Sequence, residues 1–170
     1  MSKQKEEIMF NHNGDSDIPL KVALYARVSS EEQKQGQNIQ SQIDRSDGYT
    51  EMFNLRLVDS FIDEAVSGTV PLNERPEGLW LLEAAREKRF DVVIVYRLDR
   101  LARKLKVLLD GWEELDALGV GVRSMTEPLD TSNPLGRFVM QLLGSIAELE
   151  RETILERTRD GKEASVRRGY

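Results

Sequence analysis

The stretch DVVIVYRLDRLAR, residues 91–103, decides the fold class of this sequence. Its first six residues are almost wholly apolar, which is typical of a parallel strand covered on both faces. The apolar runs KVALYARV (21–28), LRLVDSFI (55–62) and VGVRSM (120–125) predict three more strands. Because helical segments alternate with these runs, we expect an α/β domain with right-handed crossovers, in which helices flank a mostly parallel sheet.

The spacing of apolar residues between the strands predicts three helices. They are expected over 39–53, over 76–88, and from Leu101 to a stop at Gly119. A Ser-Asp-Gly interruption at 46–48 weakens the first of them. The second begins with a proline, which suits the first turn of a helix.

The last segment of the sequence differs from the alternating part. Asn133 is a suitable N-cap and Pro134 suits the first turn of one long helix. Residues 134–160 alone would extend about 40 Å at ~1.5 Å per residue. The first half of this helix is apolar over a broad face, and the second half is charged and ends basic. We expect the helix to leave the core, with its apolar half against a partner subunit and its basic half along an anionic polymer.

Composition restricts the chemistry that the chain can perform. The 170 residues include no cysteine and one histidine, His12, which lies in a polar, flexible leader over 1–19. Triads built on histidine or cysteine and zinc sites built on sulfur are therefore excluded. No apolar run approaches the ~20 residues that cross a bilayer, so a cytoplasmic protein without membrane contact is expected. An α/β domain (20–132) and the long helix (133–168) follow the leader.

Reactive polar groups lie at the carboxyl ends of two predicted strands and in a long loop over 65–78. Ligands of open α/β sheets collect at these strand ends. Several arginines there would bind a phosphate, and a serine beside them could act as a nucleophile toward phosphorus. The candidate residues are Arg27, Ser29, Arg75, Asp99, Arg100 and Arg103.

Each of these residues, taken singly, also has an ordinary structural explanation. Asp99 could simply cap the helix that follows it, and Ser29 could belong to a common turn. Arg75 could be a solvated charge in a loop that contains proline. Only the order of these residues along the chain indicates that they belong to one site.

Five motifs, in unbroken order from about residue 20 to 168, resemble the catalytic domain of serine site-specific recombinases. This family includes resolvases, invertases, large serine integrases and transposases. The wide spacing between Ser29 and Gln42, and the leader, are closer to the large serine recombinases. The resemblance implies a resolvase-like three-layer domain with a long C-terminal helix extending from the core. The motifs are YARVSS, IQSQ, Ser67-Gly68 followed by Arg75-Pro76, RLDRLAR and AELERETILERTRDG.

The same resemblance implies a role for each matching residue. Ser29 corresponds to the nucleophile, whereas Ser30 retains a neighbouring hydroxyl that does not attack. The other active-site positions that it implies are Arg27, Gln42, Arg75, Asp99, Arg100 and Arg103. The DNA-binding positions expected on the long helix are Glu156, Arg157, Arg159, Lys162, Arg167 and Arg168.

The reaction that the resemblance implies is a reversible transesterification of double-stranded DNA. Ser29 attacks a phosphate in line, which leaves a 5′-phosphoserine linkage and a free 3′ hydroxyl that later reseals the strand. The family acts as a homodimer that becomes a tetramer in the DNA synapse. Neither a metal nor ATP nor any other cofactor is required, since arginines can supply the electrostatic stabilisation.

The charge balance, 24 basic against 30 acidic residues and thus −6, is unfavourable for tight DNA binding. We therefore expect weak, nonspecific binding by this chain and a C-terminal DNA-binding region that it does not contain. Two alternatives stay open from the sequence. One is a flavodoxin-like phosphate binder, although the chain has no glycine-rich phosphate loop. The other is a non-catalytic dimerisation module.

Overall fold

The computed structural model describes residues 18–34 and 38–167, with the side chains of the last helix described as far as residue 154. The four strands are β1 (Lys21–Val28), β2 (Arg56–Glu64), β3 (Val92–Val95) and β4 (Gly121–Ser124). The longer helices are α2 (Ile39–Met52), α3 (Pro76–Arg86), α5 (Leu105–Ala117) and α6 (Pro134–Arg167). Three short turns of helix complete the described chain: α1 (Ser30–Lys34), η1 (Leu72–Glu74) and α4 (Leu98–Leu101).

The strands form one sheet in the order β2-β1-β3-β4, and each neighbouring pair is parallel. The predicted strands are confirmed, with boundaries shifted by at most two residues at each end. The central strands β1 and β3 are covered on both faces, since residues 22–28 and 92–95 are all buried. Parallel pairing brings the carboxyl ends of all four strands to one edge of the sheet, which is where the candidate residues follow.

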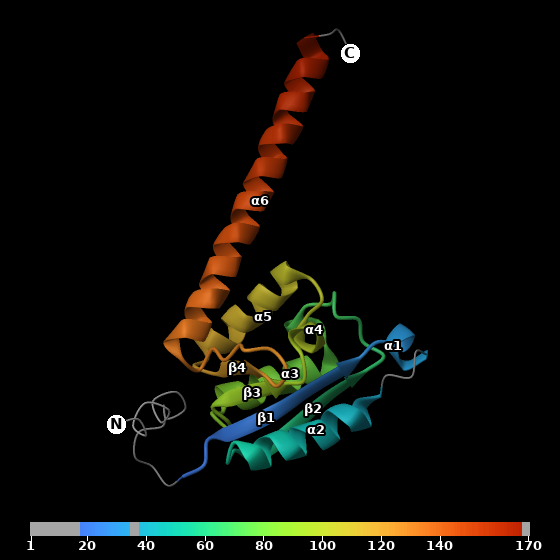
Figure 1. The fold of residues 1–170 in the computed structure, drawn as a ribbon. Helices are drawn as coiled ribbons and strands as arrows, with labels where there is room; N and C mark the ends of the chain where they lie inside the picture. Colours follow the sequence, from blue (N-terminus) through green and yellow to red (C-terminus); the bar gives the residue numbers. More distant parts are fainter. Residues whose placement is uncertain (1–17, 35–37, 168–170) are drawn as a thin grey trace, which may run out of the picture.

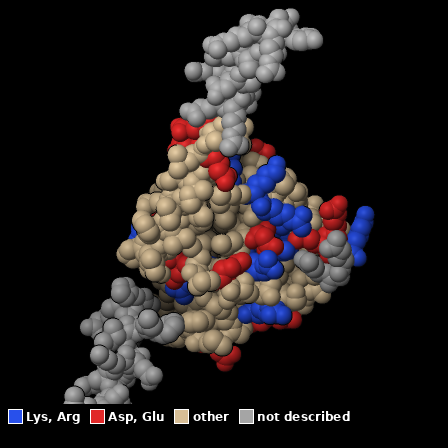
Figure 2. All heavy atoms as spheres, turned by 45° about the horizontal axis from the view of Figure 1, so that its top comes forward, with Lys and Arg blue, Asp and Glu red and all other residues tan. Residues whose placement is uncertain are grey.

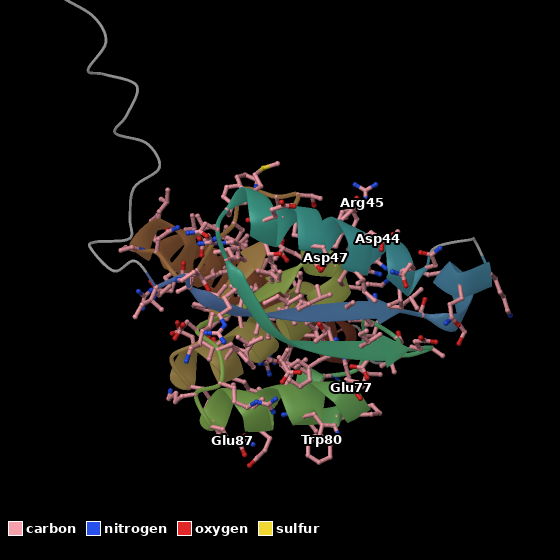
Figure 3. The ribbon with its side chains drawn as sticks, turned by 90° about the horizontal axis from the view of Figure 1, so that it is seen from below. Asp44, Arg45, Asp47, Glu77, Trp80 and Glu87 are labelled. Atoms are coloured by element: carbon pink, nitrogen blue, oxygen red, sulfur yellow. The ribbon has the colours of Figure 1, made fainter. Side chains whose placement is uncertain are left out.

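Helices cover both faces of the sheet and give the three layers that the resemblance implies (Figure 1). On one face α2 packs over Val22, Leu24 and Ile94, while α3 and α5 pack over the opposite face. Figure 3 shows α2 and α3 on opposite sides of β1 and β2, with Trp80 projecting from α3 away from the sheet. The sheet is therefore buried between two apolar clusters, and only its edges and strand ends are free to carry polar side chains.

The helix α2 is continuous through the interruption that the sequence contains at 46–48. Ser46 is fully buried, and its hydroxyl donates a hydrogen bond of 2.8 Å to the carbonyl of Ile43 in the preceding turn. A Cβ at Gly48 would meet no atom within 4 Å. The interruption therefore costs some helix propensity but breaks no contact.

Two other features were not predicted from the sequence. The polar stretch after β1 forms the short helix α1. The helix expected to run from Leu101 is divided into α4 and α5, because Ala102 and Lys104 have extended backbones. Between them the N–H of Arg103 donates to the carbonyl of Gly68 at 2.9 Å instead of continuing a helix. Because Arg103 donates to this distant carbonyl and not to a residue one helical turn earlier, it lies at the carboxyl end of the sheet.

The helix α6 leaves the body of the domain, as expected (Figure 1). Its first turn is capped by Asn133, whose side-chain oxygen accepts the N–H of Gly136 at 2.9 Å. Met140 is buried against the core. Large apolar side chains on the same helix stay exposed, namely Leu135, Phe138, Leu142, Ile146 and Leu149. No helix in the described ranges is long and apolar enough to cross a membrane.

The contact between α3 and η1 leaves no space for a side chain at Gly78, where a Cβ would overlap the Leu72 carbonyl oxygen. We expect Gly78→Ala to lower the free energy of unfolding by ~2 kcal/mol or more, because backbone must move to relieve the overlap. The matched control Gly48→Ala should leave stability unchanged or raise it by up to ~1 kcal/mol. Urea denaturation measures both, and equal effects of the two variants would contradict the packing described.

Candidate active site

Ser29 lies directly after β1, at the carboxyl end of the sheet. Its hydroxyl oxygen accepts the backbone N–H of Glu32 at 3.3 Å, and its carbonyl accepts that of Gln33 at 3.0 Å. Ser29 therefore caps α1, and it is 8% exposed. The Ser29 side chain is thus held by the same short helix that carries Glu32.

The Glu32 carboxylate is the centre of the site, and the sequence analysis did not single it out. One of its oxygens accepts the N–H of Ser29 at 2.7 Å and lies 3.2 Å from an Arg27 Nη. The other oxygen pairs with Arg100 at 2.7 Å and with Arg103 at 3.0 Å. The Glu32 side chain is only 3% exposed. One buried carboxylate thus joins the candidate nucleophile to three of the candidate arginines.

Arg27 is fully buried, and each of its three side-chain nitrogens donates at least one hydrogen bond. Its Nε donates to the Arg100 carbonyl at 3.2 Å and one Nη to the Asp99 carbonyl at 3.1 Å. Burial, together with the charges of Arg100 and Arg75, lowers the pKa of Arg27 against the opposing effect of Glu32. The guanidinium ties the end of β1 to the beginning of α4.

Asp99 and Gln42 make further hydrogen bonds with Arg100 and Arg27. The Asp99 carboxylate accepts two hydrogen bonds from Arg100, one from Nε at 3.0 Å and one from Nη2 at 3.1 Å. Gln42, which is buried on α2, donates to the Arg27 carbonyl at 3.2 Å. This bidentate pairing leaves Nη1 of Arg100 facing Glu32.

Arg75 was expected at the site, but its side chain is fully buried in the interior of the domain. It donates to the Tyr25 hydroxyl at 2.8 Å and to the Val70 carbonyl at 2.7 and 3.0 Å. The Tyr25 hydroxyl in turn donates to Asp63 at 2.7 Å. In this structure Arg75 therefore contacts β1 through Tyr25. None of its described hydrogen bonds reaches Ser29.

In the loop after β2, the carbonyl groups of every second residue each accept a hydrogen bond from one candidate arginine. The Val66 carbonyl accepts the Arg27 side chain at 2.8 Å. The Gly68 carbonyl accepts the backbone N–H of Arg103, and the Val70 carbonyl accepts the Arg75 side chain. A Cβ at Gly68 would lie 2.9 Å from an Arg27 Nη atom. The backbone of this loop therefore positions the three arginines.

The site opens to solvent on the side of Arg103, whose side chain is 43% exposed. The neighbouring Lys104 and Lys106 are also exposed. Figure 2 shows basic side chains gathered on one part of the face in view, with acidic ones between them. Among the described residues, no group of three or more His, Cys, Asp or Glu side chains could hold a metal ion.

The expected DNA-binding positions fall in or beyond the last turns of α6. The backbone of five of them is described as helix, and their side chains lie outside the described ones. Arg168 lies outside the described residues altogether. The five helical positions are Glu156, Arg157, Arg159, Lys162 and Arg167.

Glu32 gives the site a measurable pH dependence. Burial raises its pKa, but hydrogen bonds from Ser29 and the charges of Arg27 and Arg100 outweigh burial and lower the pKa from 4.5 to about 2. A lowered folded-state pKa contributes stability above the unfolded-state value, and this stability is lost as the pH falls toward the folded-state value. We expect the stability advantage of the wild type over Glu32→Gln to shrink by about 1 kcal/mol between pH ~6 and pH ~3.5. Urea denaturation at the two pH values measures it, and a constant difference would refute the ion-pair assignment.

Comparisons with known proteins identify relatives of this chain. The chain is 52% identical over 79 residues to a probable DNA-invertase of Sinorhizobium fredii, across 46% of this chain and 26% of that protein. It is 36% identical over 145 residues to the transposon Tn917 resolvase of Enterococcus faecalis, across 85% of this chain and 71% of that protein. The match therefore spans about a quarter of the first relative's length and about seven-tenths of the second's.

A solved structure matches the fold as well as the sequence. The N-terminal catalytic domain of TP901-1 integrase is 35% identical, with a TM-score of 0.71, across 78% of this chain and 98% of that one. The family model described as "Resolvase, N terminal domain" matches residues 22–170. The resemblance found in the sequence is thus confirmed, and this chain belongs to the resolvase N-terminal domain family.

Proposed function

We propose that this chain is the catalytic domain of a serine site-specific recombinase, which cuts and rejoins double-stranded DNA through a 5′-phosphoserine intermediate. The observation that carries the proposal is the position of Ser29. It directly follows the central strand β1, and its backbone N–H shares the Glu32 carboxylate with Arg27, Arg100 and Arg103. In-line attack on a phosphodiester requires a nucleophilic hydroxyl and several guanidinium groups at one place, and here the Glu32 carboxylate links the Ser29 backbone to three arginines at the same strand end.

The chemical step exchanges one phosphate ester for another. The bond between the Ser29 oxygen and phosphorus forms as the bond between phosphorus and the 3′ oxygen breaks. Ser29 gives up its hydroxyl proton, and the 3′ oxygen takes up a proton as it leaves. Arg100 and Arg103 stabilise the charge on the equatorial oxygens, and Asp99 keeps Arg100 oriented. The phosphoserine ester retains the energy of the original bond, so the 3′ hydroxyl reseals the strand without ATP or a metal.

The exposed side of the site suits an approaching DNA backbone. Arg103, Lys104 and Lys106 supply three basic side chains at its edge. The chain as a whole has a charge of −6, so its affinity for DNA is expected to be low. We therefore assign tight, sequence-specific binding to a DNA-binding region that follows the basic end of α6. The greater lengths of the invertase and resolvase relatives support this assignment.

The exposed apolar side chains of α6 support a homodimer, and a tetramer in the DNA synapse follows if all four strands are cut together. In this scheme residues 20–132 carry the chemistry, 133–168 carry assembly and DNA contact, and the protein acts on DNA in the cytoplasm, at the nucleoid. The alternative of a flavodoxin-like phosphate binder is not favoured, because the residues after β1, SSEEQ, include no glycine for a phosphate loop. A non-catalytic dimerisation module is not favoured, because the relatives are named as an invertase and a resolvase. The integrase or transposase type stays a prediction.

The proposal is tested by covalent trapping on a DNA duplex that carries the recombination site. The full-length protein is expected to form a protein–DNA adduct that survives denaturing electrophoresis. Ser29→Ala should reduce the adduct at least ~100-fold, because the attacking oxygen is lost. The neighbouring Ser30→Ala is the matched control and should keep it. Adduct in Ser29→Ala together with its loss in Ser30→Ala would move the nucleophile to the second hydroxyl.

A separate prediction follows from the way in which the loop after β2 positions the arginines. Gly68→Ala would press a methyl group against the Arg27 guanidinium, which four hydrogen bonds prevent from moving aside. We expect adduct formation to fall ~10–100-fold, because a displacement of even ~1 Å at a reacting group has effects of that size. Gly48→Ala, on the far helix α2, should retain full adduct yield. Equal yields from both variants would show that the loop does not position the arginines.

A further inference from the structure

We propose that Glu32 is an internal substitute for the scissile phosphate: its carboxylate occupies Arg100 and Arg103 until a DNA phosphate displaces it. Glu32 is in this view a positioning residue that keeps the site closed when DNA is absent. The inference rests on the proposed function and adds a way in which binding of the phosphate releases the nucleophile.

Glu32 places an anionic oxygen within ion-pair distance of two arginines that could also bind a phosphate. A guanidinium group attracts a carboxylate oxygen and a phosphate oxygen through the same positive charge. Here one oxygen of Glu32 lies 2.7 Å from Arg100 and 3.0 Å from Arg103. An incoming phosphate therefore has to compete with an anion that the protein itself supplies.

The exchange is possible without dismantling the rest of the site. The Nε and Nη2 groups of Arg100 stay with Asp99, and only its Nη1 faces Glu32. The Arg103 side chain is 43% exposed, so an external anion can reach it first. A phosphate that binds Arg103 would then replace the carboxylate at Arg100.

The exchange would also free Ser29. Glu32 is the only buried residue of α1, and the other four residues of this helix are exposed. The same carboxylate accepts the Ser29 N–H at 2.7 Å, so it holds both the helix and the serine in place. When phosphate takes the arginines, α1 loses its buried anchor. Ser29 can then turn its hydroxyl from the Glu32 N–H toward the phosphorus.

The alternative is that Glu32 only stabilises the fold. Binding of inorganic phosphate at constant ionic strength distinguishes the two, followed by NMR signals of the Ser29 amide and the arginine Nε–H groups. We expect Glu32→Gln, which keeps the side-chain shape, to bind phosphate about tenfold more tightly than the wild type, because the internal competitor is gone. Glu31→Gln removes an equal charge from an exposed position on α1 and should bind as the wild type does. Equal or weaker binding by Glu32→Gln would overturn the proposal.

A second measurement uses the wild-type chain alone and decides the matter if Glu32→Gln does not fold. Saturating phosphate should shift the Ser29 amide signal, since that amide loses its carboxylate partner, together with the signals of Arg100 and Arg103. A shift of the arginine signals without one at Ser29 would mean that Glu32 stays in place, which contradicts the exchange. Neither measurement involves DNA cleavage, so their outcome is separate from that of the Ser29→Ala trapping experiment.

Discussion

The structure depends on the burial of one guanidinium group, that of Arg27. A buried charge without partners is unstable by several kcal/mol, on the order of the whole stability of a domain. Here the charge is neutralised by Glu32, and each of the three side-chain nitrogens also donates to a carbonyl of the β2–α3 loop or the α4 turn. These partners come from three separate parts of the chain. Satisfying Arg27 therefore fixes the strand end, the loop and the turn relative to one another.

This requirement explains why the site is built largely from backbone groups. The loop over 65–71 forms no regular structure, yet alternate carbonyls in it each hold an arginine or its backbone. The separation of α4 from α5 serves the same end, because it turns Arg103 toward Glu32. Irregular segments of this kind position charged side chains while the parallel sheet supplies a rigid base.

Much of the fold follows from the sequence because its signals are local. Mainly apolar runs predicted β1 and β3, and the Asn133-Pro134 pair predicted the first turn of α6. The break between α4 and α5 could not be predicted, since the leucines on both sides keep helical spacing and the cause is a distant carbonyl at Gly68. The candidate nucleophile and three arginines were found through motif order. Glu32 was missed because a glutamate in a short polar stretch resembles an ordinary exposed one. Arg75 was also expected at the site, and in this structure it is fully buried with hydrogen bonds to Tyr25 and Val70.

The most direct test of the central claim, that Ser29 is the group joined to DNA, is to locate the covalent bond itself. The DNA adduct of the full-length protein would be digested with protease and nuclease, and the modified peptide sequenced by tandem mass spectrometry. The account predicts one modified residue, Ser29, linked to the nucleotide through its 5′ phosphate. A nucleotide on any other side chain, or a linkage through the 3′ phosphate, would contradict it.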